Sequence, residues 1–164
     1  MSTAFRPILA AEDEENDRFI LNLAFDQAKL SHPLVTVRDG QECVNYLSGA
    51  AVYADRAKHP LAALLLLDLK MPRMHGFEVL EWLATQPQFK DLPVFVLSSS
   101  SDDSDIQKER QLGAWDYFIK PHALSDLVNI LHRLQKRCLS AASTVSEVVP
   151  LQSGASESII ARQI

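Results

Sequence analysis

The sequence has few cysteines and no long hydrophobic run. Only 2 of its 164 residues are cysteines, Cys43 and Cys138, and they lie too far apart for the short spacing of metal sites. We therefore expect both to fill helix positions as small apolar side chains rather than to form a disulfide. No stretch of about 18 or more apolar residues occurs, which excludes a membrane-spanning helix. The N-terminal segment becomes acidic before a signal-type apolar core develops, which predicts a cytoplasmic protein.

The chain also lacks an excess of positive charge. It has 16 Lys and Arg residues against 21 Asp and Glu residues, for a net charge of −5. Nucleic-acid-binding proteins usually present a basic face, so we expect no direct nucleic-acid partner and, without an apolar span, no membrane partner. The hydrophobic share of 47% and the charged share of 23% are those of an ordinary globular protein, and the length of 164 residues suggests one domain.

Short apolar runs alternate with segments of helical period, which is the pattern of parallel βαβ units. We expect strands over 7–11, 33–37, 62–68, 93–98 and 116–120. We expect helices around 19–24 and over 39–47, 77–85, 105–112 and 124–134. In the first of these helices, Phe19, Ile20, Leu23 and Ala24 recur as one apolar face. Right-handed crossovers would fold the five pairs into a doubly wound parallel α/β sheet.

The composition changes at about residue 140. Residues 140–164 are rich in Ser and Ala and are interrupted by Pro150 and Gly154. We therefore expect one domain over residues 1–139 and a C-terminal tail over residues 140–164. The tail is either flexible or docks on a partner through its two apolar stretches, "SEVVPL" and "ESIIARQI".

Polar side chains stand where the expected strands end. Glu12 and Asp13 follow the first strand, Asp68 the third and Ser98 the fourth, and Lys120 closes the fifth. The carboxyl ends of parallel strands share one sheet edge, where ligands bind in such folds. Converging carboxylates favour a hard cation, and Mg²⁺ suits them because it keeps several waters. With the Lys120 ammonium and the Ser98 hydroxyl, this site could accept a phosphoryl group.

Each of these residues also has a purely structural interpretation. An Asp after a strand is usually a turn or helix N-cap residue, and Glu12 and Asp13 also fit an acidic first helical turn. Ser98 could cap a loop, and Lys120 could be an exposed charge at a strand end. Their joint occurrence at one sheet edge favours the functional interpretation.

The segments "AEDEEND", "LLLLDLKMPRMHGFEVL", "VFVLSSS" and "LGAWDYFIKP", in this order, resemble the response-regulator receiver domain (CheY-like) over residues 6–139. The resemblance implies a flavodoxin-like (βα)5 fold with strand order 2-1-3-4-5. The long segment before the third strand is similar to that of stand-alone receivers associated with phytochrome-type histidine kinases.

The resemblance also implies a role for each site residue. Asp68 corresponds to the phosphoacceptor of the family. Asp13, Asp68 and the main-chain carbonyl of Lys70 correspond to its Mg²⁺ ligands, with Glu12 acting through water. Ser98 corresponds to the hydroxyl residue that contacts the phosphoryl group.

Five further positions follow from the same resemblance. Lys120 corresponds to the lysine that pairs with the phosphoryl group, and Tyr117 to the aromatic side chain that swings inward as the hydroxyl of Ser98 moves. The Lys120–Pro121 bond corresponds to one that is typically cis in the family, whereas sequence alone predicts trans. Pro72 and Gly76 would shape the loop that leaves the third strand, with Gly76 allowing a close approach to the next helix.

The implied function is that of a single-domain switch rather than an enzyme with an external substrate. Phosphorylation by a histidine kinase or a phosphotransfer protein would bias the face of the fourth helix, fifth strand and fifth helix toward a target protein or a second copy of the chain. A phosphate-shuttling or phosphate-sink receiver and a docking-only receiver remain alternatives. A haloacid-dehalogenase-type phosphohydrolase is a further one, but Lys70 stands where that family has its second Asp.

Overall fold

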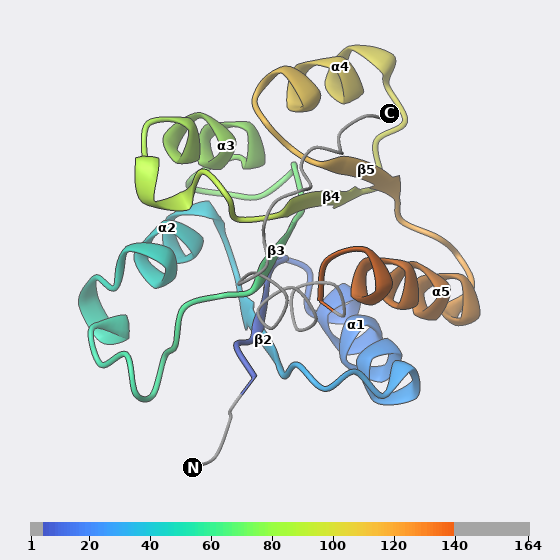
Figure 1. The fold of residues 1–164 in the computed structure, drawn as a ribbon. Helices are drawn as coiled ribbons and strands as arrows, with labels where there is room; N and C mark the ends of the chain where they lie inside the picture. Colours follow the sequence, from blue (N-terminus) through green and yellow to red (C-terminus); the bar gives the residue numbers. More distant parts are fainter. Residues whose placement is uncertain (1–4, 140–164) are drawn as a thin grey trace, which may run out of the picture.

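The computed structural model describes residues 5–139. Five parallel strands form one sheet in the order β2-β1-β3-β4-β5, as expected (Figure 1). The strands are β1 (Ile8–Ala11), β2 (Leu34–Val37), β3 (Leu64–Leu67), β4 (Val94–Ser98) and β5 (Asp116–Ile119). The predicted doubly wound α/β fold is therefore confirmed, while the predicted tail over residues 140–164 lies outside the described residues.

Helices cover both faces of the sheet, with α1 and α5 on one side and α2 and α3 on the other (Figure 1). The α-helices are α1 (Glu15–Ala28), α2 (Gly40–Ser48), α3 (Gly76–Ala84), α4 (Asp103–Gln111) and α5 (Leu124–Leu134). Short 3₁₀ segments span Ala51–Tyr53 and Pro87–Phe89, and a π-helical turn spans Gln135–Leu139. α4 lies beside β5, at the edge of the sheet.

The central strand β3 explains why the fold has two hydrophobic cores. Its leucines alternate, so that Leu64 and Leu66 pack with α1 and α5, while Leu65 and Leu67 pack with α2 and α3. All four are at most 3% exposed. Burying a leucine side chain contributes about 1.5–3 kcal/mol, so this strand alone is a large part of the core.

The predicted apolar face of α1 is confirmed only in part: Ala24 is buried and Ile20 packs against the core, but the other two residues do not. Phe19 is 61% exposed and Leu23 is also exposed, whereas the buried residues of the helix are Leu21, Ala24, Phe25 and Ala28. This buried set follows the i, i+3, i+4, i+7 spacing of a helix face packed on a sheet. The sequence alone offered two overlapping apolar stripes, and the packing against α5 selects the second.

Other local features follow the sequence more closely. Cys43 is buried in α2 and Cys138 is half-buried, and both are free thiols, as predicted. α4 begins two residues before the predicted start because the Asp102 side chain caps it, accepting a hydrogen bond from Ser104 N at 3.0 Å. The Lys120–Pro121 bond is trans, unlike the bond typical of the family. None of the described helices is both long enough and apolar enough to span a bilayer.

Candidate functional site

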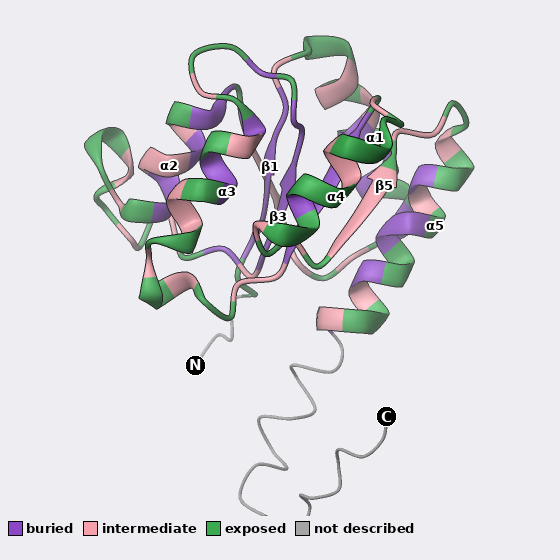
Figure 2. Cartoon of the chain, turned by 90° about the horizontal axis from the view of Figure 1, so that it is seen from above, coloured by how far each residue is buried: buried purple, intermediate pink, exposed green. Residues whose placement is uncertain are grey.

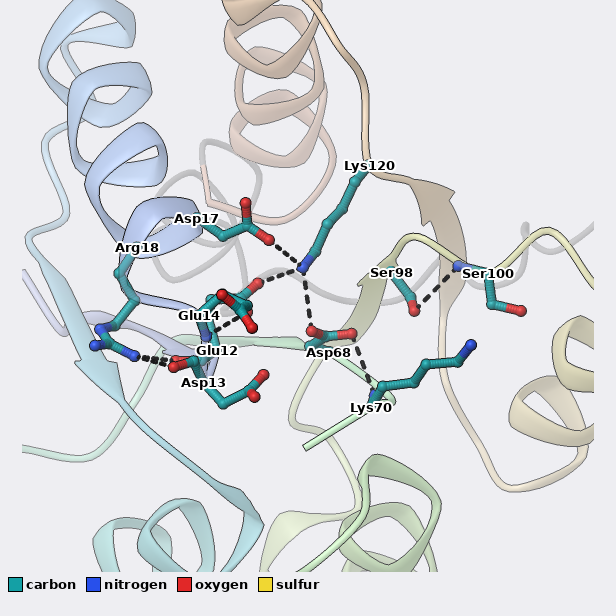
Figure 3. Close-up of polar contacts among 10 residues, drawn as sticks. All are labelled: Glu12, Asp13, Glu14, Asp17, Arg18, Asp68, Lys70, Ser98, Ser100 and Lys120. Carbon is teal, nitrogen blue, oxygen red and sulfur yellow. Dashed lines mark hydrogen bonds and ion pairs between the residues drawn. The ribbon is translucent and has the colours of Figure 1, made fainter. Parts of the chain in front are cut away.

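The site lies at the edge of the sheet where β1, β3 and β5 end (Figure 3). Backbone hydrogen bonds continue the strand pairing by one residue at this edge. Glu12 N donates to Val37 O at 3.0 Å, Asp68 N donates to Ala11 O at 3.1 Å and Lys120 N donates to Ser98 O at 2.8 Å. The polar side chains therefore stand on backbone that the sheet already fixes, and the predicted convergence of Glu12, Asp68 and Lys120 is observed.

The Lys120 ammonium is the centre of the site. Its Nζ lies 2.6 Å from Glu12 Oε2, 2.8 Å from Asp17 Oδ2 and 3.1 Å from Asp68 Oδ2. Burial alone would lower the pKa of this ammonium, but the hydrogen bonds to Asp17 and Glu12 and the charge of Asp68 raise it above its ordinary value. Lys120 is therefore a fixed positive charge beside the Asp68 carboxylate.

Glu12 is a buried carboxyl of the site with a raised pKa. It is only 6% exposed, and this burial raises its pKa to about 7, although the hydrogen bond from Lys120 opposes the rise. The charge of Asp68 raises the pKa further. A second positive charge near Glu12 and Asp68 would relieve this repulsion.

Glu12, Asp13 and Asp68 form a cluster able to hold a cation. Each offers one carboxylate oxygen, and these oxygens lie within 4.8 Å of one another. An all-oxygen donor set that is partly open to water matches the preference of small hard divalent cations. The loop after Asp68 turns back on this carboxylate, since Lys70 N donates to Asp68 Oδ1 at 3.3 Å (Figure 3).

Ser98 and Tyr117 lie on the β4–β5 side of the site. Ser98 is fully buried at the end of β4, and its Oγ accepts a weak hydrogen bond from Ser100 N at 3.4 Å. The Tyr117 hydroxyl donates to Ser100 O at 2.6 Å. Burial raises the pKa of Tyr117, against the opposing interactions with Ser100 and Ser98, so the hydroxyl stays protonated and can donate. Tyr117 is thereby tied to the loop between β4 and α4.

Asp17 and Arg18 belong to the site but were not predicted. Arg18 Nη1 donates to both Glu12 O and Asp13 O at 2.8 Å and so fixes the loop after β1 (Figure 3). Asp17 comes from the first turn of α1 and reaches Lys120. The available signal was the spacing of Asp17 four residues after Asp13, which places it one helical turn beyond the strand end.

The loop from Asp68 to α3 is held by contacts on its far side. Met74 N donates to Pro72 O at 2.6 Å, Met74 O accepts from Gly40 N at 3.1 Å and Gly76 N donates to Leu69 O at 2.9 Å. The exposed Arg73 side chain, on a backbone with a left-handed φ of 62°, forms an ion pair with the buried Asp39. Arg73 and Asp39 are therefore positioning residues of this loop that the sequence did not indicate.

Gly76, at the start of α3, lies close to the backbone of the site loop. A Cβ at this position would lie 2.5 Å from Asp68 O and 2.6 Å from Leu69 Cα, both backbone atoms of the site loop. We expect Gly76→Ala to lower the free energy of unfolding by about 1–3 kcal/mol and to weaken divalent-cation binding, because the Asp68 backbone must move. Urea denaturation and a metal titration measure the two effects.

Gly113→Ala is the matched control for this experiment. Gly113 has a φ of 102° but no heavy atom near the position of a Cβ, so alanine there strains the backbone without touching the site. We expect a comparable loss of stability, about 1–2 kcal/mol, with unchanged cation affinity. Equal cation affinity in wild type and Gly76→Ala would contradict the assignment of Gly76 to the site.

Comparison with known proteins places this geometry in a family. The family model of the response regulator receiver domain matches residues 8–132. Response regulator Rcp1 of Synechocystis sp. is 29% identical over 128 residues, which are 78% of this chain and 85% of Rcp1. The crystal structure of the Mn(2+)-bound form of Rcp1 superposes with a TM-score of 0.69 and 25% identity, covering 92% of this chain and 99% of that one.

Two further solved structures show the same architecture. Response regulator RPA3017 in red light signalling of R. palustris has a TM-score of 0.75 and 34% identity, covering 80% of this chain and 92% of its own. The phosphorylated cyanobacterial phytochrome response regulator RcpA has the same score and identity, covering 84% and 96%. The family match spans most of the chain and includes every strand and the acidic cluster at their ends. This chain therefore belongs to the response regulator receiver domain family, the CheY-like receivers of two-component systems.

Proposed function

We propose that this protein is a stand-alone response regulator that accepts a phosphoryl group on Asp68 from a histidine kinase or a phosphotransfer protein. The observation that carries the proposal is the Asp68 carboxylate, which lies 3.1 Å from the Lys120 ammonium and inside the cluster with Glu12 and Asp13. A carboxylate nucleophile flanked by fixed positive charge is what phosphoryl transfer to an acyl phosphate requires.

In the proposed step, a carboxylate oxygen of Asp68 forms the new P–O bond as the P–N bond of the donor phosphohistidine breaks. The electron pair of the broken bond stays on the imidazole, which takes its proton from solvent. Lys120 neutralises charge on Asp68 and then pairs with the phosphoryl oxygens. Asp13, Asp68, the Lys70 carbonyl and, through water, Glu12 are the residues proposed to hold Mg²⁺, which would supply charge neutralisation for the phosphoryl oxygens.

The response to phosphorylation would pass through Ser98 and Tyr117. The Ser98 hydroxyl is proposed to contact the phosphoryl group, and the Ser98–Ser100–Tyr117 contacts connect this movement to β5. The outer face of α4, β5 and α5 would then bind a downstream protein or a second copy of the chain. A protein that only shuttles or drains phosphate would use the same Asp68 chemistry without this last step.

The relatives support a specific setting for the proposed function. RPA3017 is described in red light signalling and RcpA as a phytochrome response regulator, so the kinase partner we propose is of the phytochrome type. We place the protein in the cytoplasm and expect no turnover of an external substrate. Residues 1–139 would carry this activity, with residues 140–164 as a flexible or partner-docking tail.

Incubation with acetyl phosphate and Mg²⁺ tests the proposal. We expect the intact mass to increase by one phosphoryl group, in an adduct that is stable to acid and labile to base, and that disappears when EDTA is present from the start. Absence of an adduct with acetyl phosphate and with phosphorylated kinases would contradict the proposal. Continuous release of phosphate from monoesters would indicate the hydrolase alternative instead.

A further inference from the structure

Helix α4 packs on the rest of the protein through a buried charged-type residue, which is unusual for a helix. Glu109 is 0% exposed and is the only residue of α4 (Asp103–Gln111) that is buried. Figure 2 shows α4 exposed along most of its length, in contrast to α5 with its several buried turns. Helices of this kind normally pack through leucine or alanine, so a glutamate at the single buried position needs a physical explanation.

Neither carboxyl oxygen of Glu109 has a hydrogen-bond partner. Oε1 and Oε2 are both inaccessible to solvent, and among the described residues they are the only buried side-chain polar atoms left without a partner. An ionised carboxylate in this position would lose its hydration and gain no compensating contact, which costs several kcal/mol. The arrangement therefore favours the neutral, protonated acid over the carboxylate.

The groups around Glu109 do not neutralise a charge there. On the same helix, Arg110 is exposed and lowers the pKa of the Glu109 carboxyl only in part. The other cation of this helix, Lys108, places its Nζ over the Phe77 ring of α3, 4.4 Å from the ring centroid. From β5, Asp116 adds a negative charge that is already paired with Arg137 at 3.0 Å.

The remaining neighbouring elements also supply no positive charge. The Tyr117 hydroxyl of β5 is committed to Ser100 O, and β4 has no ionisable side chain. The glutamates of α3, Glu78 and Glu81, are exposed. Burial is accordingly the main influence on Glu109 and raises its pKa to about 7.

We propose that Glu109 is a proton-dependent anchor of α4, so that α4 packs against β5 while the carboxyl is protonated and is released when the carboxyl loses its proton to solvent. Linkage makes the relation reciprocal, since any event that displaces α4 also lowers the proton affinity of Glu109. Because α4 follows the loop of Ser100, to which Tyr117 is bonded, the anchor would make the output face sensitive to pH. Only this last consequence rests on the proposed function.

The direction of the pH effect follows from the raised pKa. The docked state binds the proton more tightly than the released state, in which the carboxyl has its ordinary pKa of 4.5. Docking is therefore strongest in acid and weakens as the pH rises from about 4.5 to about 7, above which no further weakening occurs. Over this interval the docking equilibrium constant is expected to fall on the order of 100-fold.

Hydrogen exchange of the unphosphorylated full chain tests the anchor. We expect protection factors of the α4 amides, relative to those of α1, to fall on the order of 100-fold between pH 5 and pH 8 in the wild type. In Glu109→Gln and Glu109→Met, which cannot ionise, the same ratio is expected to be independent of pH. Glu78→Gln, at an exposed glutamate of α3, is expected to behave as the wild type.

Three results would overturn the proposal. These are a pH-independent ratio in the wild type, a wild-type fall that persists in both Glu109 variants, or a fall that is lost in Glu78→Gln. Met fills the volume without a polar group, so it reports on the anchor even where Gln loosens the packing. The experiment needs no phosphoryl donor, so its outcome is independent of whether Asp68 accepts phosphate.

Discussion

Replacement of Asp68 by asparagine is expected to reduce phosphoryl incorporation by on the order of 100-fold or more, to the detection limit of intact-mass measurement. The amide oxygen of asparagine carries no full negative charge and cannot form a stable acyl phosphate. Glu12 cannot replace Asp68 without rearrangement, because its carboxylate is held by Lys120 at 2.6 Å and by Glu14 N at 3.1 Å. The loss should therefore be close to complete.

The matched control is Asp91→Asn. Asp91 is exposed and has only a loose ion pair with Lys90 at 3.7 Å, so its removal is expected to leave incorporation unchanged. Circular dichroism and urea denaturation of both variants verify the fold. If Asp68→Asn retained the wild-type adduct, another residue would be the acceptor, and peptide mapping of the adduct would identify it.

The same substitution should also weaken the cation site. Asp68 supplies one of the three carboxylates of the cluster with Glu12 and Asp13. We expect the affinity for Mg²⁺ or Mn²⁺ to fall by about 10-fold or more in Asp68→Asn, since a divalent cation loses a charged ligand.

The sequence predicted the strands of this fold well because burial on both faces leaves a strong local signal. The four consecutive leucines Leu64–Leu67 indicated a strand buried on both faces, which they form. A Cβ at Gly76 would clash with the Asp68 backbone. The stripe of α1 was predicted only in part, because Phe19 and Leu23 have the same periodicity as the buried set but are exposed. Periodicity gives the spacing of a face but does not say which of two apolar faces packs inward.

The convergence of Glu12, Asp13, Asp68 and Lys120 could be predicted because these residues stand just after the ends of strands that share one sheet edge. The missed residues depend on tertiary contacts. Asp17 looked like an ordinary acidic residue of a first helical turn, and only the position of Lys120 across the sheet edge brings it into the site. Glu109 was missed for a similar reason, because a helix with the composition "DSDIQKERQ" predicts exposure at every charged position.

Lys120→Met is expected to destabilise the protein by about 2–4 kcal/mol in the absence of divalent cations. The ammonium lies within 3.1 Å of Glu12, Asp17 and Asp68, and its side chain is only 19% exposed, so solvent does little to replace it. Methionine preserves much of the aliphatic volume, so the loss reports mainly on charge. Guanidinium denaturation of wild type and variant in EDTA measures the difference.

Two controls separate charge from packing at Lys120. Lys90→Met removes an exposed ammonium with one loose partner and is expected to change stability by no more than about 0.5 kcal/mol. Addition of Mg²⁺ should stabilise Lys120→Met more than the wild type, because the cation then takes over the role of the missing ammonium next to Glu12 and Asp68. If Mg²⁺ stabilised both proteins equally, Lys120 and the cation would act on different carboxylates. This result would contradict a site in which both neutralise Glu12 and Asp68.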